Sequence, residues 1–246
     1  MEKLEGKVAI VTGGAMGNGL GIVKVFLRHK AQVIILDYAN ELDQTLVSLK
    51  EEYPQEVVDG YQVDIRDMTR LKAITEEIYN KYGHIDILVN NAGINSDNYI
   101  LFMDMDQWNN VLNVNLTGTY LCSRYFSKNM IKNNVGKIIN IASLKGQRGS
   151  EGQSNYSASK SGIIGLSKAL ARELGDFNIA VNVVCPGYIT TDLNKGVSSK
   201  KVIAEQMSTL DVYYGLSDLI NFVMFLSSDL VKGISGQIFN LDSRIK

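Results

Sequence analysis

The chain has 246 residues, a formal net charge of −1 at pH 7, 45% hydrophobic residues and 21% charged residues. This balance is typical of one globular α/β domain and not of a disordered chain, and without a dense basic block we expect no nucleic-acid partner. No apolar run reaches about eighteen residues and the first seven residues lack a signal core, so we expect no membrane partner and a cytoplasmic protein. Two cysteines without C-x-x-C spacing and two histidines predict no metal site.

A short apolar run, residues 8–11, leads into a turn with five glycines and then into the apolar stretch 22–29. The pattern predicts a buried strand, a tight turn and a helix. Glycine lets the backbone approach a ligand closely, and the first N–H groups of a helix attract anions, so the turn predicts a pyrophosphate site. The spacing Gly13-x-x-x-Gly17-x-Gly19 lacks the lysine of a P-loop, which disfavours phosphate transfer. A glycine-rich turn without a ligand is the alternative interpretation.

The next apolar run, residues 31–37, ends in Asp37, which lies 18 residues after Gly19. In dinucleotide-binding folds an acid near this spacing binds the ribose hydroxyls, and it would repel a 2′-phosphate. A compensating cation is missing at the nearby positions Met16, Asn18, Tyr38 and Ala39. The sequence therefore predicts NAD(H) in preference to NADP(H). Asp37 as the N-cap of the following helix is an alternative that does not exclude this role.

Strands and helices continue to alternate to the end of the chain. Strands are predicted over 8–11, 31–37, 56–63, 85–90, 137–141, 180–184 and 235–241, and helices over 22–29, 41–53, 67–82, 106–133, 156–175 and 216–228. Continuous apolar strands separated by helices predict an α/β fold: a single doubly wound (Rossmann-like) domain over residues 1–246, with a seven-stranded parallel sheet flanked by helices on both faces. The polar segment 188–213, with a short helix near 200–208, is predicted to be a substrate lid.

Polar residues follow several of these strands, where doubly wound sheets hold their ligands. Asn90-Asn91-Ala92-Gly93 is such a turn, and His84 in the turn before that strand is interpreted as structural. Asp64 ends the third strand, where it either contacts adenine or is simply a loop acid; the sequence leaves both open.

Tyr156 and Lys160 lie four residues apart and therefore project from one face of a helix. A nearby ammonium stabilises a phenolate and is expected to lower the Tyr156 pKa from its ordinary value near 10. The phenol would then exchange a proton with a carbonyl or alcohol near neutral pH. Ser143, thirteen residues earlier at the end of a buried strand, is placed to hold the same substrate oxygen.

In the order and spacing of these motifs, the chain resembles the short-chain dehydrogenase/reductase family over essentially its whole length. The matching residues are Thr12-Gly13-x-x-x-Gly17-x-Gly19, Asn90-Asn91-Ala92-Gly93, Asn115, Ser143, Tyr156-x-x-x-Lys160 and Pro186-Gly187. The resemblance implies that Tyr156 is the general acid or base and that Ser143 orients the carbonyl. It also implies that Lys160 binds the nicotinamide ribose and that Asn115 holds a water of the proton relay.

The resemblance further implies a nicotinamide cofactor site and a homotetramer built on the helices near 106–133 and 155–175. The predicted cofactor-binding residues are Gly13, Met16, Gly17, Asn18, Gly19, Leu20, Asp37, Asp64, Ile65, Asn91, Ala92, Gly93, Tyr156, Lys160, Pro186, Gly187, Ile189 and Thr191.

Within the family, residues 92–98 and 152–156 are most similar to the 3-oxoacyl-thioester reductases, including the acyl-carrier-protein reductases. Asp37 departs from them because those enzymes mostly use NADPH, and Asn134 and Phe177 stand where basic carrier-docking residues are common. The expected substrate is a 3-oxoacyl thioester on coenzyme A or on an acyl carrier protein. The alternatives are an NAD-dependent dehydrogenase of another secondary alcohol, such as a sugar, polyol or steroid, and a non-catalytic NAD-binding protein.

Overall fold

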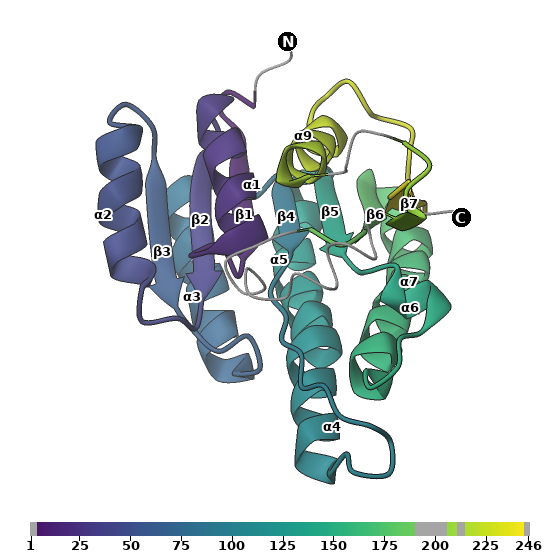
Figure 1. Cartoon of the computed structure of the whole chain (residues 1–246). Helices are drawn as coiled ribbons and strands as arrows, with labels where there is room; N and C mark the ends of the chain where they lie inside the picture. Colours follow the sequence, from purple (N-terminus) through teal and green to yellow (C-terminus); the bar gives the residue numbers. More distant parts are fainter. Residues whose placement is uncertain (1–3, 190–205, 211–214, 244–246) are drawn as a thin grey trace.

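The computed structural model describes residues 4–189, 206–210 and 215–243. Seven parallel strands form one sheet in the order β3-β2-β1-β4-β5-β6-β7, which confirms the predicted fold (Figure 1). The strands are β1 (Val8–Thr12), β2 (Gln32–Asp37), β3 (Val58–Gln62), β4 (Ile87–Asn90), β5 (Gly136–Ile141), β6 (Ile179–Pro186) and β7 (Ile238–Leu241). The order reverses between β1 and β4, and ligands bind outside the carboxyl ends of the strands at such a switch point.

Helices cover both faces of the sheet (Figure 1). The helices are α1 (Gly17–Arg28), α2 (Leu42–Glu52), α3 (Met68–Tyr82), α4 (Met105–Leu112), α5 (Thr119–Asn133), the short α6 (Lys145–Arg148), α7 (Ser154–Leu174) and α9 (Leu216–Ser227), with a π-helical turn (Asn113–Gly118) between α4 and α5 and a 3₁₀ turn (Gly175–Phe177) after α7. The predicted helix 106–133 is therefore helical throughout, but its hydrogen-bonding pattern changes to that of a π-helix between α4 and α5.

Two apolar layers form the core because successive side chains of a strand point to opposite faces. In β1, Ala9 and Val11 pack with α1, α2 and α9, whereas Val8 and Ile10 pack with α3 and α5. Phe26 of α1 and Phe126 of α5 are fully buried, one in each layer. Burying a side chain of this size stabilises a fold by about 1.5–3 kcal/mol, so these layers position the strand ends that carry the site.

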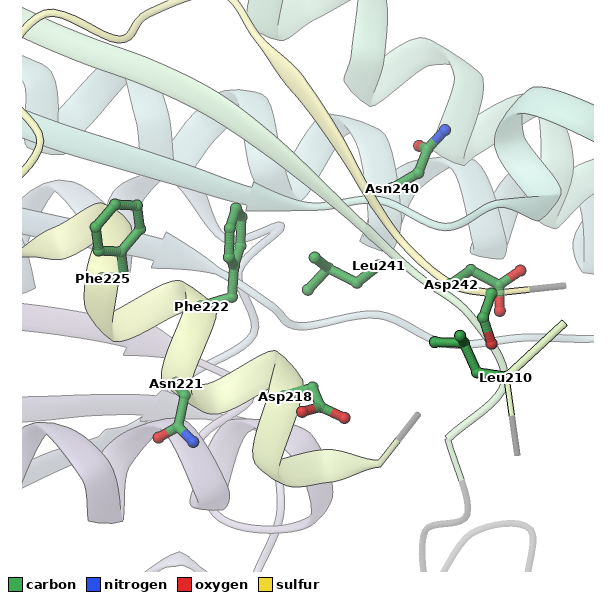
Figure 2. A pocket seen from close by; sticks show the side chains of 9 residues that line it. Leu210, Asp218, Asn221, Phe222, Phe225, Asn240, Leu241 and Asp242 are labelled. Atoms are coloured by element: carbon green, nitrogen blue, oxygen red, sulfur yellow. The ribbon is translucent and has the colours of Figure 1, made fainter. Parts of the chain in front are cut away.

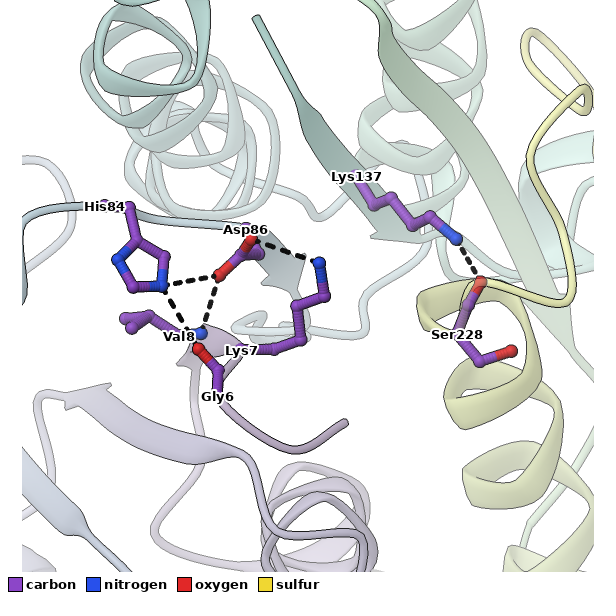
Figure 3. A network of polar contacts seen from close by, with 7 residues as sticks. All are labelled: Gly6, Lys7, Val8, His84, Asp86, Lys137 and Ser228. Carbon is purple, nitrogen blue, oxygen red and sulfur yellow. Dashed lines mark hydrogen bonds and ion pairs between the residues drawn. The ribbon is translucent and has the colours of Figure 1, made fainter. Parts of the chain in front are cut away.

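A polar cluster fastens β1 to β4 at the amino edge of the sheet (Figure 3). The Asp86 carboxylate accepts a hydrogen bond from the Val8 amide at 2.8 Å and lies 3.5 Å from the Lys7 ammonium. The His84 Nε2 atom lies 3.1 Å from the Gly6 carbonyl oxygen and 3.2 Å from Asp86. The structure therefore agrees with the interpretation of His84 as structural, since these contacts join chain segments far from the strands' carboxyl ends.

Several predicted boundaries are wrong by a few residues, each for a local reason. The predicted strand 235–241 begins only at Ile238 because Gly236, with φ +73°, departs from extended geometry, although its amide still donates to the Val181 carbonyl at 2.7 Å. The helix predicted to begin at Tyr156 begins at Ser154. Most of the predicted lid lies outside the described residues, within which no helix is long and apolar enough to cross a membrane.

Candidate active site

The turn after β1 is packed directly against the turn after β4. The Thr12 hydroxyl accepts hydrogen bonds from the amides of Asn91 and Ala92, both at 3.0 Å. In the opposite direction, the Asn91 side-chain amide donates to the carbonyls of Thr12 at 3.1 Å and Gly13 at 3.0 Å. Four hydrogen bonds thus hold two of the predicted cofactor-binding segments together at the switch point of the sheet.

Glycine is required at two positions in this turn. Gly13 has φ +65°, and a β-carbon there would lie 2.8 Å from the Ala92 Cα atom. A β-carbon on Gly19 would lie 1.9 Å from the Gly13 carbonyl oxygen, which is an impossible contact. The packing therefore excludes side chains at both positions and brings the turn after β1 into close contact with the start of α1 and with Asn91.

The first turn of α1 fits a phosphate group. No described side chain caps the helix at Met16, which is 40% exposed. The Asn18 Oδ1 atom is buried and has no hydrogen-bond partner among the described residues. Uncapped N–H groups at a helix N-terminus attract anions. Buried polar atoms normally have a hydrogen-bond partner, so the Asn18 oxygen is available to a ligand. These residues therefore fit the pyrophosphate of a dinucleotide, while Leu20 turns inward and packs on the core.

Asp37 follows β2 at the same edge of the sheet. Its carboxylate accepts hydrogen bonds from the Ala15 amide at 2.8 Å and the Ala39 amide at 3.0 Å. The alternative in which Asp37 caps the next helix is wrong, because α2 begins at Leu42 after Glu41 and has no side-chain cap. Two backbone donors instead hold the carboxylate beside the glycine turn.

Asp64 forms an ion pair in the loop after β3. Its carboxylate accepts from the Arg66 guanidinium at 2.6–3.0 Å, and Arg66 also donates to Asn110 at 2.8 Å. The hydrogen bonds from Arg66 lower the pKa of Asp64. The ion pair holds Asp64 in the loop, and its contact with adenine stays a prediction. The neighbouring Ile65 is buried and its side chain packs against Gly118.

The residues predicted to do chemistry meet beside Gly93. A β-carbon on Gly93 would lie 3.2 Å from Asn115 Oδ1 and 3.5 Å from the Lys160 ammonium. The Lys160 side chain is part of α7 and hydrogen-bonds with the Ile141 carbonyl at 2.9 Å, near the end of β5. Its Nζ atom lies 5.6 Å from the centre of the Tyr156 ring.

Asn115 lies in the π turn and is fully buried. Its side-chain oxygen accepts from the Ile94 amide at 2.8 Å, and its nitrogen donates to the Ile94 carbonyl at 2.9 Å and the Ser159 hydroxyl at 3.1 Å. Single π turns inside helices are frequent at functional sites. Here the turn directs the Asn115 side chain into the protein, where its hydrogen bonds connect the loop after β4 with α7.

The pKa of Tyr156 is raised, whereas the sequence predicted that Lys160 would lower it. Burial raises this pKa, because a phenolate loses solvation, while a hydrogen bond from Ser143 lowers it in part and the charge of Asp97 raises it further. Burial also lowers the pKa of Lys160 to about 8. The prediction from spacing considered the charge of Lys160 but not the loss of water from both groups.

The buried ammonium makes stability depend on pH. The pKa of Lys160 is about 8 in the folded protein and 10.5 in an ordinary lysine. Between these values the unfolded chain binds the proton and the folded chain does not, so wild-type stability rises with pH in this window. We expect Lys160→Met to remove this rise, so that the variant's stability relative to wild type falls by up to about 3 kcal/mol from pH 7 to pH 10.5.

Urea unfolding of the cofactor-free proteins at several pH values measures this difference. Lys168→Met, which replaces an exposed lysine of the same helix, is the control and should show no such change. A stability difference between wild type and Lys160→Met that stays constant from pH 7 to pH 10 contradicts the assignment of the buried ammonium.

The remaining predicted residues follow β6. Pro186 ends the strand, and the Gly187 amide donates to the Leu241 carbonyl at 3.1 Å, while Ile189 is buried. Thr191 lies outside the described residues.

A hollow of about 620 Å³ lies nearby between α9 and β7 (Figure 2). Its lining residues are Leu210, Asp218, Asn221, Phe222, Phe225, Asn240, Leu241, Asp242 and Ser243. None of the predicted site residues lines it. The described residues contain no group of three His, Cys, Asp or Glu side chains arranged to hold a metal ion.

Sequence reasoning missed two sets of contacts around the site. Buried polar side chains of Asn90, Ser123, Asn140 and Ser167 form a chain of hydrogen bonds of 2.8–3.0 Å beneath the strand ends. Lys145, on α6, contacts Gln153. The contact between Lys145 and Gln153 had a signal in the sequence, since a charged residue stands only two positions after Ser143.

The fold and the site define a nucleotide-binding oxidoreductase. The family model described as short chain dehydrogenase matches residues 7–202. The chain belongs to this family and is an NAD(P)-dependent oxidoreductase that acts on CH–OH groups or the corresponding carbonyls.

Curated relatives match along almost the entire chain. A protein of Thermotoga maritima named 3-oxoacyl-[acyl-carrier-protein] reductase FabG is 37% identical over 241 residues, 98% of each chain. A protein of the same name from Chlamydia muridarum is 37% identical, and the match covers 97% of each chain. Another from Aquifex aeolicus is also 37% identical, and the match covers 98% of this chain and 97% of the relative.

Proposed function

We propose that the protein reduces 3-oxoacyl thioesters with NADH. The relatives carry the name of such a reductase. The observation that carries the proposal is the grouping of the predicted catalytic residues at the carboxyl edge of the sheet, where the Lys160 ammonium lies 5.6 Å from the centre of the Tyr156 ring and packs, with Asn115, against Gly93. Two hydroxyl groups on a rigid strand end and a helix are suited to hold one carbonyl oxygen.

In this mechanism Ser143 donates a hydrogen bond that orients the 3-oxo group. A bound nicotinamide would supply a hydride to the carbonyl carbon. Tyr156 donates its proton to the carbonyl oxygen, so one hydride and one proton convert the ketone into a secondary alcohol. Its raised pKa keeps the phenol protonated at neutral pH, which suits reduction.

Lys160 and Asn115 would complete the site. Lys160 would bind the nicotinamide ribose and, once its charge faces the phenolate, stabilise it. Asn115 would hold a water through which the proton on Tyr156 is replaced. The support for both roles is their position against Gly93, where a β-carbon would contact both side chains.

The proposal is tested by measuring the oxidation of NADH and NADPH side by side with acetoacetyl-CoA. Turnover with NADH supports the reaction and the cofactor preference together. A panel of sugars, polyols and steroids assayed for NAD reduction at alkaline pH tests the second candidate, a dehydrogenase of another secondary alcohol. NADH binding without any turnover would indicate a non-catalytic protein.

Asp37 supports the preference for NADH because its carboxylate, which is held beside the glycine turn by the Ala15 amide, would repel a 2′-phosphate. We expect Asp37→Ala to shift the ratio of kcat/KM for NADH over NADPH towards NADPH by at least about tenfold, which corresponds to about 1.4 kcal/mol. Asp43→Ala, at an exposed position of α2, is the matched control. A ratio within twofold of the wild-type value would show that Asp37 does not contact the ribose.

We further propose a cytoplasmic homotetramer that accepts the thioester from coenzyme A or an acyl carrier protein. Lys128, Lys132 and Arg172 are exposed and available to an acidic carrier. Lys137 is not available to a carrier, because its ammonium donates to the carbonyl of Ser228 (Figure 3) and also to that of Val231. Light scattering tests the assembly, with an expected mass about four times the 27.2 kDa of one chain.

A further inference from the structure

Three polar side chains form a continuous chain at one side of the candidate active site. The Lys145 ammonium donates a hydrogen bond to the Gln153 side-chain oxygen. The nitrogen of the same Gln153 amide donates to the Asp97 carboxylate at 2.6 Å. Because one end of the amide accepts and the other donates, its orientation is determined by a cation on one side and an anion on the other.

This chain lies next to the reacting groups. The Lys145 backbone amide donates to the Ser143 hydroxyl oxygen at 3.2 Å. Asp97 is close enough for its charge to act on Tyr156. A β-carbon on Gly146 would lie 2.8 Å from the Lys160 β-carbon, so α6 packs directly on the catalytic part of α7.

The supporting contacts make the position of Lys145 well defined. Gln153 is 5% exposed, and the Asn98 amide donates to the Gly152 carbonyl at 2.8 Å, which holds the loop carrying Asp97 against the start of α7. An ammonium group has three N–H donors, so a hydrogen bond to Gln153 is compatible with another to a substrate. A lysine held by a buried amide is a preorganised donor of charge-assisted hydrogen bonds.

A 3-oxoacyl thioester presents two carbonyl oxygens separated by a single methylene group. A group that binds the thioester oxygen while Ser143 and Tyr156 bind the 3-oxo oxygen must therefore lie next to these two residues, as Lys145 does through the hydrogen bond of its amide to Ser143. We propose that Lys145 is a substrate-binding residue whose ammonium donates a hydrogen bond to the thioester carbonyl oxygen, with Gln153 and Asp97 as positioning residues. This inference rests on the proposed function, since it names the group of that substrate that Lys145 contacts.

The test is steady-state kinetics of Lys145→Met and Lys145→Arg with acetoacetyl-CoA and NADH. We expect Lys145→Met to raise KM for acetoacetyl-CoA at least about tenfold while kcat changes less than about threefold and the Kd for NADH stays at the wild-type value. Lys145→Arg, which keeps the charged donor, should restore most of the loss. Lys168→Met, on the outer surface of α7, is the matched control.

Each other outcome has a separate meaning. An active wild type with an unchanged KM in Lys145→Met overturns the role of Lys145 and leaves the proposed function standing. A joint fall in kcat and NADH affinity would show a merely structural role and also overturns it. Absence of wild-type turnover overturns the proposed function itself, and the inference with it. If free acetoacetate competes better than acetoacetyl-CoA and loses this advantage in Lys145→Met, the residue binds a carboxylate and the thioester assignment is wrong.

Discussion

Replacing Tyr156 with phenylalanine is expected to lower kcat for carbonyl reduction by about 100- to 10,000-fold, the usual contribution of general acid catalysis. The ring remains and only the hydroxyl is lost, so its packing beside Lys160 persists. The hydroxyl of Ser143 still accepts a hydrogen bond from the Lys145 amide. NADH should therefore bind with nearly wild-type affinity, measured by calorimetry alongside the rate.

The control is Tyr82→Phe, which removes another partly buried phenol far from the site. Tyr82 is the last residue of α3, its hydroxyl donates to Asp59, and burial raises its pKa. This variant should lose about 1 kcal/mol of stability and keep full activity. If Tyr156→Phe retains more than a third of the wild-type kcat, the proton comes from another group.

Replacing Gly19 with alanine is expected to abolish measurable NADH binding, with an affinity loss of more than about 100-fold. The added β-carbon would lie 1.9 Å from the Gly13 carbonyl oxygen and 2.7 Å from Asn91 Nδ2. Because the nearer neighbour is a backbone atom, the turn must move to accommodate the methyl group, and the first residues of α1 must move with it. Overpacking of this kind also costs about 1–3 kcal/mol of stability, which thermal unfolding measures.

Gly165→Ala, in the middle of α7, is the matched control. A β-carbon there meets no heavy atom within 4 Å, and alanine favours a helix over glycine by up to about 1 kcal/mol. This variant should bind NADH normally and unfold at the same or a higher temperature. Wild-type NADH affinity in Gly19→Ala would show that the glycine turn is not the phosphate-binding element.

The sheet could be predicted from the sequence because its strands are continuous apolar runs that end in polar turns. Runs such as residues 8–11 and 31–36 are buried on both faces, and only a sheet covered by helices on both sides satisfies that pattern. Boundaries were less predictable where a single backbone angle decides them, as at Gly236.

The residues that meet beside Gly93 could also be named from sequence. Their spacing places Tyr156 and Lys160 on one helix face, whereas Asn115 was named only through the resemblance to the family. The pKa shifts of these residues could not be predicted from the sequence. The pKa directions of Tyr156 and Lys160 depend on how completely the fold removes water from them. The partners of Asp64 and Lys145 depend on side-chain directions within loops, which no periodic pattern encodes.

The four hydrogen bonds between Thr12, Gly13 and the turn after β4 have a consequence for how the site opens. They join the ends of the two central strands, so neither turn can move without disturbing the middle of the sheet. We therefore expect hydrogen exchange of these amides to require nearly the free energy of global unfolding. A dinucleotide meets a rigid surface there, and little of its binding energy is spent on ordering the protein around its phosphates.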